Sequence, residues 1–266
     1  MQAYVINLAR SSERRAHMIA ELEKSGIDYE IVTAIDDRNL DLSDTKTVHP
    51  SYLNRDDFRP GRTGNGLSHL RVYQKILADG LDRALVLEDD VTLSAELGSV
   101  ADAVGEHLSG SEIALLTFDS EATCELSIHG LVRLPSSRSL AFPIDIGQPV
   151  GAAAYVITRE ACQRLTDTIM PIRAHSDDWS YWFRQGTLDS VRCVVPHAVV
   201  KNPGFESTID YYSPSSLKAR LLKTIARPEL PLIHKVISYR RRRIWRQWTR
   251  VELVDKPFVE KPSRLG

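Results

Sequence analysis

The apolar positions at the start of the chain predict a strand, a helix and a second strand. Residues 3–8 form a continuous apolar run that ends at a polar turn, where Ser11 or Ser12 supplies a helix N-cap. Apolar residues then recur at helical spacing as far as Gly26, a residue typical of a helix C-terminus, and residues 29–32 form a second short strand. This order normally produces parallel strands, so the opening predicts an α/β fold.

The rest of the pattern continues the alternation. Residues 36–62 are rich in Asp, Asn, Pro and Arg and have little periodicity, which predicts a long irregular segment that lies over a site. The apolar run at 84–87 suits the centre of the sheet. The expected elements are a helix from Gly66 to Gly80, the strand 84–87, a helix at 95–108, a strand at 113–118, loops through Pro149, a strand at 151–157, a helix capped by Thr158, and a strand at 191–195. We therefore predict a mostly parallel central sheet.

Length and composition fit one folded domain with an appendage. The chain has 266 residues, of which 42% are hydrophobic and 26% are charged, which excludes a disordered or fibrous protein. The segment between Lys218 and Arg250 holds 11 basic residues and one acidic residue, so the remainder has 34 − 11 = 23 basic and 35 − 1 = 34 acidic residues. We predict a main domain at 1–215 and a helical basic tail at 216–266, and we expect the acidic body not to bind nucleic acid.

The compartment expected from the sequence is the cytoplasm. The three cysteines are far apart in the sequence and lack metal-site or redox spacing, so they indicate buried thiols. The N-terminal apolar run precedes its charges, which is the reverse of a secretory signal, and no apolar run is long enough to cross a bilayer.

Three consecutive carboxylates, Glu88, Asp89 and Asp90, close the apolar run 84–87. Like charges at this spacing repel one another, and a divalent cation such as Mn²⁺ or Mg²⁺ is the natural compensator because it prefers hard oxygen ligands. Open α/β sheets also bind ligands beyond the carboxyl ends of their strands. The alternative is a solvated turn at the end of a strand, and the residues alone leave the two readings about evenly balanced.

Four stretches in this order resemble glycosyltransferase family 25, the lipooligosaccharide and lipopolysaccharide hexosyltransferases. They are residues 5–10 (VINLAR) with 13–15 (ERR), residues 64–69 ending in Leu-Ser-His, residues 87–90 (LEDD) and residues 151–157 (GAAAYVI). The resemblance implies a GT-A type nucleotide-diphospho-sugar transferase fold and a UDP-hexose donor. It also implies a divalent metal, inversion at the anomeric carbon and a lipid-linked oligosaccharide acceptor.

The same resemblance implies roles for individual residues. Glu88 and Asp90 are the expected metal ligands. His197, after the last core strand, is a further candidate ligand, as a late histidine is in some GT-A enzymes. The expected donor-binding residues are Asn7, Leu8, Arg10, Arg14, Ser68, His69 and Asp89. A lone histidine such as His69 is more often a packing residue, and that alternative stays open.

The chain departs from the family at residues 61–65, which read Gly-Arg-Thr-Gly-Asn where the family commonly has Gly-Glu-Ile-Gly-Cys. Arg62 stands in the place of an acid. Either the pocket recognises a different sugar, or an arginine suited to phosphate or carboxylate replaces an acidic contact to sugar hydroxyls.

An inverting transfer needs a base for the acceptor hydroxyl. The segment 175–179 (HSDDW) offers Asp178, which we favour from sequence, and Asp177, beside aromatic residues on which sugar rings stack. The alternative is an N-capping Asp before a helix whose tryptophans belong to the core.

The basic tail combines Arg240 to Arg243 with Trp245 and Trp248. This composition is typical of a helix that lies on an anionic membrane surface, here the inner face of the cytoplasmic membrane. A charged helix packed on the domain is the alternative. The sequence therefore predicts a metal-dependent inverting transferase that moves galactose or glucose to a bacterial surface glycan. The rival hypotheses are a degenerate domain that binds nucleotide or glycan without turnover, and a membrane-associated scaffold.

Overall fold

The computed structural model describes residues 1–119, 124–127, 129–205 and 259–260. The basic tail predicted at 216–266 lies outside these residues, apart from the short strand β12 (Val259–Glu260), which pairs with β6 (Leu126–Ser127). Among the described residues, no helix has both the length and the apolar character needed to cross a bilayer.

An eight-stranded sheet forms the centre of the molecule, in the order β2-β1-β3-β9-β5-β10-β8-β7. Its strands are β1 (Ala3–Asn7), β2 (Tyr29–Thr33), β3 (Arg83–Glu88), β5 (Glu112–Leu115), β7 (Val132–Arg133), β8 (Ser139–Ala141), β9 (Ala154–Thr158) and β10 (Ser190–Val195). Strands β1, β5 and β9 are buried along their length, as are the four central residues of β3 and the first five of β10. This burial explains why most of their residues are apolar.

The sheet is mixed, so the prediction of a mostly parallel sheet is wrong. Three pairs are parallel: β1 with β2, β1 with β3, and β5 with β10. Four pairs are antiparallel, because β9 is inserted between β3 and β5 in the opposite direction and β8 and β7 extend the edge as a hairpin. A buried strand has the same continuous apolar pattern in either direction, which is why the sequence did not reveal the orientation of β9.

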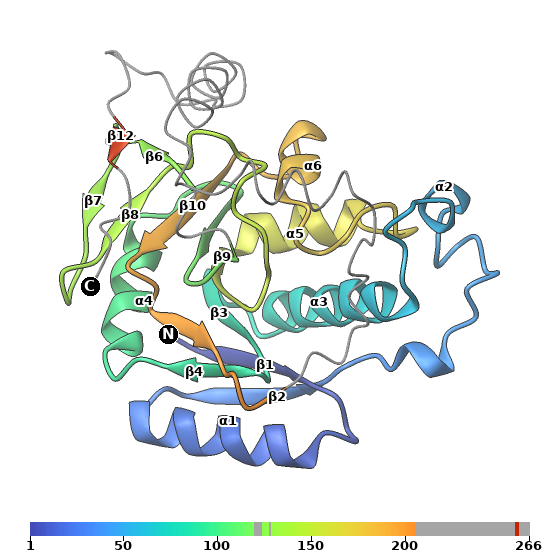
Figure 1. Cartoon of the computed structure of the whole chain (residues 1–266), viewed down its shortest axis with the longest axis horizontal. Coiled ribbons are helices and arrows are strands. Elements are labelled where there is room, and N and C mark those ends of the chain that lie inside the picture. Colours follow the sequence, from blue (N-terminus) through green and yellow to red (C-terminus); the bar gives the residue numbers. More distant parts are fainter. Residues whose placement is uncertain (120–123, 128, 206–258, 261–266) are drawn as a thin grey trace, which may run out of the picture.

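Helices cover both faces of the sheet (Figure 1). On one face, α1 (Ser12–Ser25) and α4 (Leu97–Glu106) bury apolar residues such as Met18 and Val100. On the other, α3 (Pro60–Ala78), α5 (Arg159–Thr168) and α6 (Trp179–Arg184) build a second core that includes Tyr73, Leu165 and Trp179. The result is a three-layer α/β arrangement with two cores separated by the sheet.

Local signals explain several element ends. Gly26 follows α1 in the left-handed conformation, and Thr158 caps α5 by accepting a hydrogen bond from the Ala161 amide at 3.2 Å. The irregular segment contains the 3-10 helix η1 (Asp37–Asn39) and α2 (Pro50–Leu53), and α3 begins at Pro60, six residues before the expected start at Gly66. Proline is favoured in the first turn of a helix because its missing amide would have no partner there.

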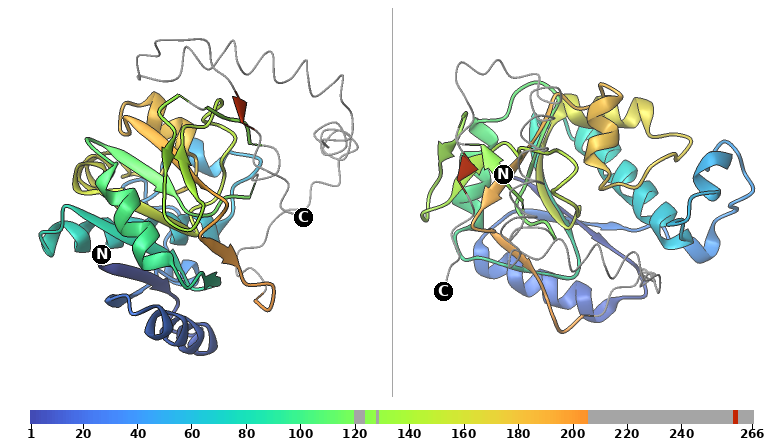
Figure 2. Two further views of the ribbon diagram at one scale, coloured as in Figure 1. Left: turned by 90° about the vertical axis from the view of Figure 1, so that its left-hand side faces the viewer. Right: turned by 45° about the horizontal axis from the view of Figure 1, so that its top comes forward.

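Two further strands, β4 (Val91–Leu93) and β11 (Val199–Lys201), form an antiparallel pair beside the carboxyl end of β3. This pair brings residues 199–202 next to the acidic turn at 89–90. Figure 1 and the right-hand view of Figure 2 place α2 and the start of α3 at the end of the molecule farthest from β7 and β8.

Candidate active site

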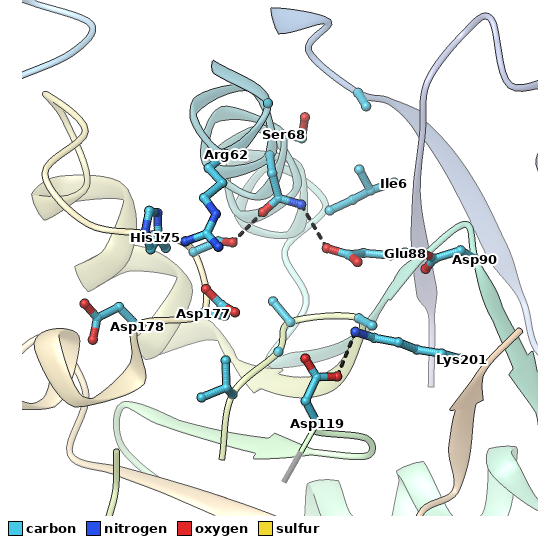
Figure 3. A pocket seen from close by; sticks show the side chains of 18 of the residues that line it. Ile6, Arg62, Ser68, Glu88, Asp90, Asp119, His175, Asp177, Asp178 and Lys201 are labelled. Carbon is cyan, nitrogen blue, oxygen red and sulfur yellow. Dashed lines mark hydrogen bonds and ion pairs between the residues drawn. The ribbon is translucent and has the colours of Figure 1, made fainter. Parts of the chain in front are cut away.

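A cavity of about 480 Å³ lies beyond the carboxyl ends of β1 and β3. Its size is within the range of small-ligand sites. Residues from widely separated parts of the sequence form the wall: Leu8 and Arg10 after β1, Asn65 and Ser68 on α3, the acidic residues 88–90, and the segment 175–180 (Figure 3). The long irregular segment contributes too, through Asp37, Arg55 and Asp57, as predicted.

The acidic turn divides its three side chains between the cavity and the protein interior. Asp89 is 7% exposed, and its carboxylate accepts hydrogen bonds from Asn7 Nδ2 at 2.7 Å and from Arg14 Nη1 at 2.9 Å. Asn7 Nδ2 also donates to the Ser11 carbonyl at 3.1 Å, which ties the end of β1 to the start of α1. Asn7 and Arg14 therefore act behind the cavity wall, where they hold the acidic turn, and neither lines the cavity.

Glu88, the last residue of β3, is held on the cavity side by α3. Its Oε1 accepts a hydrogen bond from Asn65 Nδ2 at 2.9 Å and lies 3.4 Å from His69 Nε2. His69 is fully buried and contacts the Tyr155 hydroxyl through Nδ1 at 2.7 Å, so it supports Glu88 from the core rather than lining the cavity. Burial alone would raise the pKa of Glu88, but the hydrogen bonds from His69 and Asn65 lower it below its usual value.

Asp90 is the least compensated carboxylate of the turn. Its Oδ1 is buried and has no hydrogen-bond partner among the described residues. Burial and the neighbouring charge of Glu88 raise the pKa of Asp90 to about 6. A buried carboxylate oxygen without a hydrogen-bond partner lowers the stability of the folded protein. A bound ligand that supplies positive charge would compensate for this loss.

The carboxylates fit a divalent cation that is shared with a bound phosphate. Eight Asp or Glu residues line the cavity, against four Lys or Arg residues, so an anionic ligand alone would meet net repulsion there. Among the residues that the structure describes, no three His, Cys, Asp or Glu side chains are grouped to hold a metal. Mg²⁺-type ions are usually bound by one or two carboxylates together with substrate phosphates, and Glu88 with Asp90 satisfies that requirement.

The two candidate bases have different environments. Asp178 caps α6, where it accepts hydrogen bonds from the Tyr181 amide and the Ser180 hydroxyl, both at 3.2 Å, and it lies 3.9 Å from Arg55 Nη1. Asp177 points into the cavity from the wall opposite Glu88 (Figure 3). Burial raises the pKa of Asp177, and the charge of Glu88 adds to this.

The remaining predicted residues take different positions. Leu8, Arg10 and Ser68 line the cavity; Arg10 pairs with Asp36, and the Ser68 hydroxyl accepts from the Ile35 amide at 2.8 Å. His197 is outside the cavity lining, since its ring packs on Phe118 with the ring centroids 4.6 Å apart. Its role as a metal ligand stays a prediction that this position does not favour.

Several cavity residues have no role assigned from sequence, and Asn65, Ser176, Lys201 and Asp119 are among them. Asn65 bridges Glu88 and Ser176, whose hydroxyl donates to Asn65 Oδ1. Lys201 Nζ and Asp119 Oδ1 form an ion pair at 2.7 Å that spans the cavity wall (Figure 3). Lys201 and Asp119 follow no motif, and only the pairing of β11 with β4 brings Lys201 near the acidic turn.

The chain is similar to known proteins over much of its length. Residues 1–180 match the family model described as glycosyltransferase family 25 (LPS biosynthesis protein). The probable inactive glycosyltransferase 25 family member 3 of Rattus norvegicus is 36% identical over 97 residues, which are 34% of this chain and 17% of that protein. Procollagen galactosyltransferase 2 of Homo sapiens is 34% identical over 97 residues, covering 34% of this chain and 16% of that protein.

The sequence match over a longer stretch and the match to a solved structure have lower sequence identity. The inactive glycosyltransferase 25 family member 3 of Homo sapiens is 26% identical over 186 residues, or 64% of this chain and 31% of that protein. The chain thus spans less than a third of the length of these relatives. A crystal structure of a putative glucose-1-phosphate thymidylyltransferase from Bacillus anthracis aligns with a TM-score of 0.35 and 10% identity, covering 71% of this chain and 66% of that one. Such a score supports no conclusion about function. The family model covers 180 of the 266 residues, however, and the chain belongs to glycosyltransferase family 25.

Proposed function

We propose that the protein transfers galactose or glucose from a UDP-hexose to a surface glycan of the lipopolysaccharide type, with inversion at the anomeric carbon, on a GT-A type fold. The observation that carries the proposal is the placement of Glu88 and Asp90 across one cavity from Asp177. The description of the matching family model names lipopolysaccharide biosynthesis, which supports the choice of acceptor. Three relatives are named procollagen galactosyltransferases, which supports galactose as the sugar.

In this proposal Glu88 and Asp90 receive the diphosphate end of the donor. A bound Mn²⁺ or Mg²⁺ supplies positive charge that stabilises the departing diphosphate. Asn7 and Arg14 keep Asp89 and the turn fixed, and Asn65 and His69 keep the Glu88 carboxylate facing the cavity. Holding these groups in place before the substrate arrives is what makes electrostatic stabilisation effective.

Asp177 is the better base of the two candidates, which reverses the order that we expected from sequence. A base must keep a lone pair for the acceptor hydroxyl, and its pKa must lie near the working pH. Asp178 already uses its carboxylate to cap α6 and faces Arg55. Asp177 has a raised pKa and faces the cavity opposite Glu88, as an in-line attack on the anomeric carbon requires.

A donor screen tests this function. UDP-galactose and UDP-glucose are incubated with the protein and Mn²⁺, and release of UDP is measured with and without lipooligosaccharide acceptors. We expect turnover with one donor, and a loss of about 100-fold or more in Asp90→Asn and Asp177→Asn. Asp178→Asn should retain more activity, and Asp167→Asn on the exposed face of α5 is the matched control. Full activity of Asp177→Asn would exclude it as the base.

A second candidate function is binding without turnover. Several of the matched relatives are named inactive, and Arg62 lines the cavity where the family commonly has an acid. Calorimetry that detects UDP binding, combined with no release of UDP from any sugar nucleotide in the presence of acceptors, would favour this function over catalysis.

We also propose that the segment between Lys218 and Arg250 holds the protein, as a cytoplasmic enzyme, against an anionic membrane and so close to a lipid-linked acceptor. The support is its sequence, which combines arginines with tryptophans. Sedimentation with phosphatidylglycerol vesicles should be lost at high salt and in a variant with Arg240 to Arg243 changed to Gln. Vesicle binding that survives in the quadruple variant would contradict the proposal. Vesicle binding in a protein without turnover would instead favour the scaffold hypothesis.

A further inference from the structure

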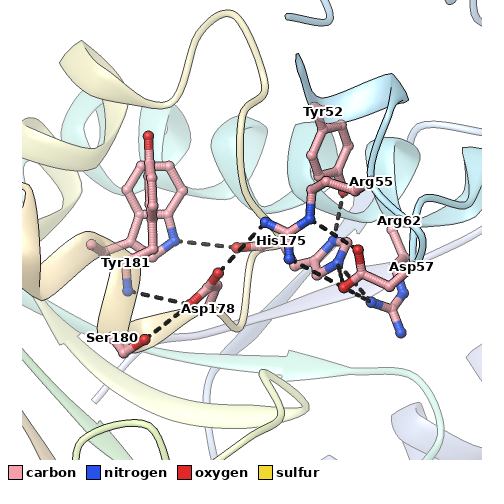
Figure 4. A network of polar contacts seen from close by, with 9 residues as sticks. Tyr52, Arg55, Asp57, Arg62, His175, Asp178, Ser180 and Tyr181 are labelled. Carbon is pink, nitrogen blue, oxygen red and sulfur yellow. Dashed lines mark hydrogen bonds and ion pairs between the residues drawn. The ribbon is translucent and has the colours of Figure 1, made fainter. Parts of the chain in front are cut away.

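The segment that carries Asp177 is attached to the neighbouring elements through its other side chains. His175 is buried, and its Nδ1 lies 2.6 Å from the Tyr52 hydroxyl while its Nε2 lies 2.8 Å from Asp57 Oδ2 (Figure 4). The next residue, Ser176, is 8% exposed and donates its hydroxyl hydrogen to Asn65. Asp178 caps α6. All four residues of 175–178 line the cavity, and the Asp177 side chain points into it from the wall opposite Glu88 (Figure 3).

Two contacts of this segment come from one face of α3. Arg62 Nη1 lies 2.7 Å from His175 Nε2, and Asn65, three residues later, contacts Ser176. Residues three apart on a helix are neighbours on its surface, so the first turns of α3 present a matching pair of polar side chains to two consecutive residues of the segment. Arg62 and Asn65 are also two of the positions at which this chain departs from the family pattern.

Asn65 differs from Arg62 because it contacts both sides of the cavity. The Glu88 carboxylate can only accept a hydrogen bond, so the Asn65 amide nitrogen must face Glu88 and the amide oxygen must face the Ser176 hydroxyl. One planar group thus fixes Glu88 on one side and the main chain next to Asp177 on the other. No aliphatic side chain and no carboxylate at position 65 can make both bonds.

We propose that Asn65 is a positioning residue that sets the separation between the Glu88 side of the cavity and Asp177. The proposal rests on the function proposed above, in which the donor diphosphate lies at Glu88 and Asp90 and the acceptor hydroxyl lies at Asp177. Transfer requires the attacking oxygen, the anomeric carbon and the leaving oxygen to be in line, and a displacement of about 1 Å costs on the order of 100-fold in rate. Asn65 limits that displacement through its two hydrogen bonds.

Single substitutions separate this role from a structural one. Ser176→Ala removes the bond on the Asp177 side and leaves the bond between Asn65 and Glu88. We expect kcat for UDP release from UDP-galactose or UDP-glucose with Mn²⁺ to fall about tenfold or more, while the Kd of UDP from calorimetry changes by less than about twofold. Ser176→Thr keeps the hydroxyl and should recover most of the rate. Ser99→Ala on α4, on the opposite face of the sheet, is the matched control.

The double variant tests whether the two residues act together. Asn65→Ala should lower kcat at least as much as Ser176→Ala, and Asn65→Ala/Ser176→Ala should resemble Asn65→Ala rather than show the product of the two losses, because both changes interrupt one chain of contacts. Thermal unfolding of each variant excludes loss of the fold as the cause.

The outcomes distinguish this inference from the proposed function. A wild-type protein that turns over neither sugar nucleotide with any acceptor would overturn both. Wild-type turnover with unchanged kcat in Ser176→Ala, or with fully additive effects in the double variant, would overturn the positioning role alone. A loss in Ser176→Ala that appears entirely in the Kd of UDP would also overturn it.

Discussion

The buried pair of Arg14 and Asp89 is the contact on which the position of the acidic turn depends most. Their side chains are each 10% exposed, and the two charged atoms lie 2.9 Å apart. Arg14→Met keeps the length and the apolar part of the side chain but leaves the Asp89 carboxylate buried, with the hydrogen bond from Asn7 retained. Arg14 also lies over the ring of Phe205, 5.4 Å from its centroid, and methionine preserves an apolar contact there.

The cost follows from the loss of one partner of a buried ion pair. Removing one partner typically costs about 3–5 kcal/mol because the other charge stays buried without compensation. The retained hydrogen bond from Asn7 argues for the lower end, about 3 kcal/mol. For a domain of this size each kcal/mol lowers Tm by roughly 2–4 °C, so we expect a decrease of about 6–12 °C.

Thermal unfolding monitored by circular dichroism measures this decrease, with Arg15→Met as the control, because Arg15 is the exposed neighbour on α1. We expect the control to stay within about 1 °C of wild type, since surface substitutions change stability little. The opposite pattern would refute the reasoning. If Arg14→Met unfolds at the wild-type temperature and instead weakens UDP binding, then Arg14 contacts the nucleotide, as we first expected from sequence, and does not support Asp89.

Three other predictions concern the same region. Gly64→Ala should destabilise the protein by about 1–3 kcal/mol, because the added Cβ would lie 2.8 Å from the Ile35 carbonyl oxygen. In the control, Gly66→Ala, the added Cβ would lie 3.4 Å from a side-chain carbon, so this change should be neutral or stabilising by up to about 1 kcal/mol. Urea unfolding measures both effects. The pKa of the Asp90 carboxyl is 3.8 in the unfolded chain and about 6 in the folded protein. At a pH between these two values, the folded protein therefore binds more protons at Asp90 than the unfolded chain does. Stability without divalent ions should therefore fall as the pH increases from about 4 to above 6, and Asp90→Asn should lack this decrease. Tyr155→Phe should cost about 1–3 kcal/mol in urea unfolding, because its hydroxyl contacts His69 at 2.7 Å inside the core, and an unchanged midpoint would contradict that role.

The fold was predictable where local pattern and burial coincide. The strand, helix and strand of residues 3–33, the helix stop at Gly26 and the cap at Thr158 are all found as expected. The antiparallel course of β9 and the edge strands β7 and β8 were missed. Strand direction is set by where the chain returns to the sheet, and that information is absent from the apolar pattern of a buried strand.

The sequence indicated where the candidate site lies better than it indicated which contacts the individual residues make. The acidic triplet at the end of a buried strand lies in the wall of the cavity, and its role as a metal site stays a prediction. The sequence did not show that the Asp89 carboxylate is bonded by Asn7 and Arg14, because those two residues come from another strand and helix. Asn65 was noticed as a departure from a motif, yet its bridge to Ser176 joins residues 111 positions apart and appears only in the folded chain.

The central claim is that Glu88 and Asp90 bind a divalent ion together with the donor diphosphate, in a cavity whose opposite wall carries Asp177. A crystal of the protein soaked with MnCl₂ and UDP, measured at the manganese absorption edge, tests it most directly. We predict an anomalous peak in contact with the Asp90 carboxylate and with the UDP phosphates. UDP bound elsewhere on the molecule, or bound in the cavity with the peak away from both carboxylates, would contradict the account.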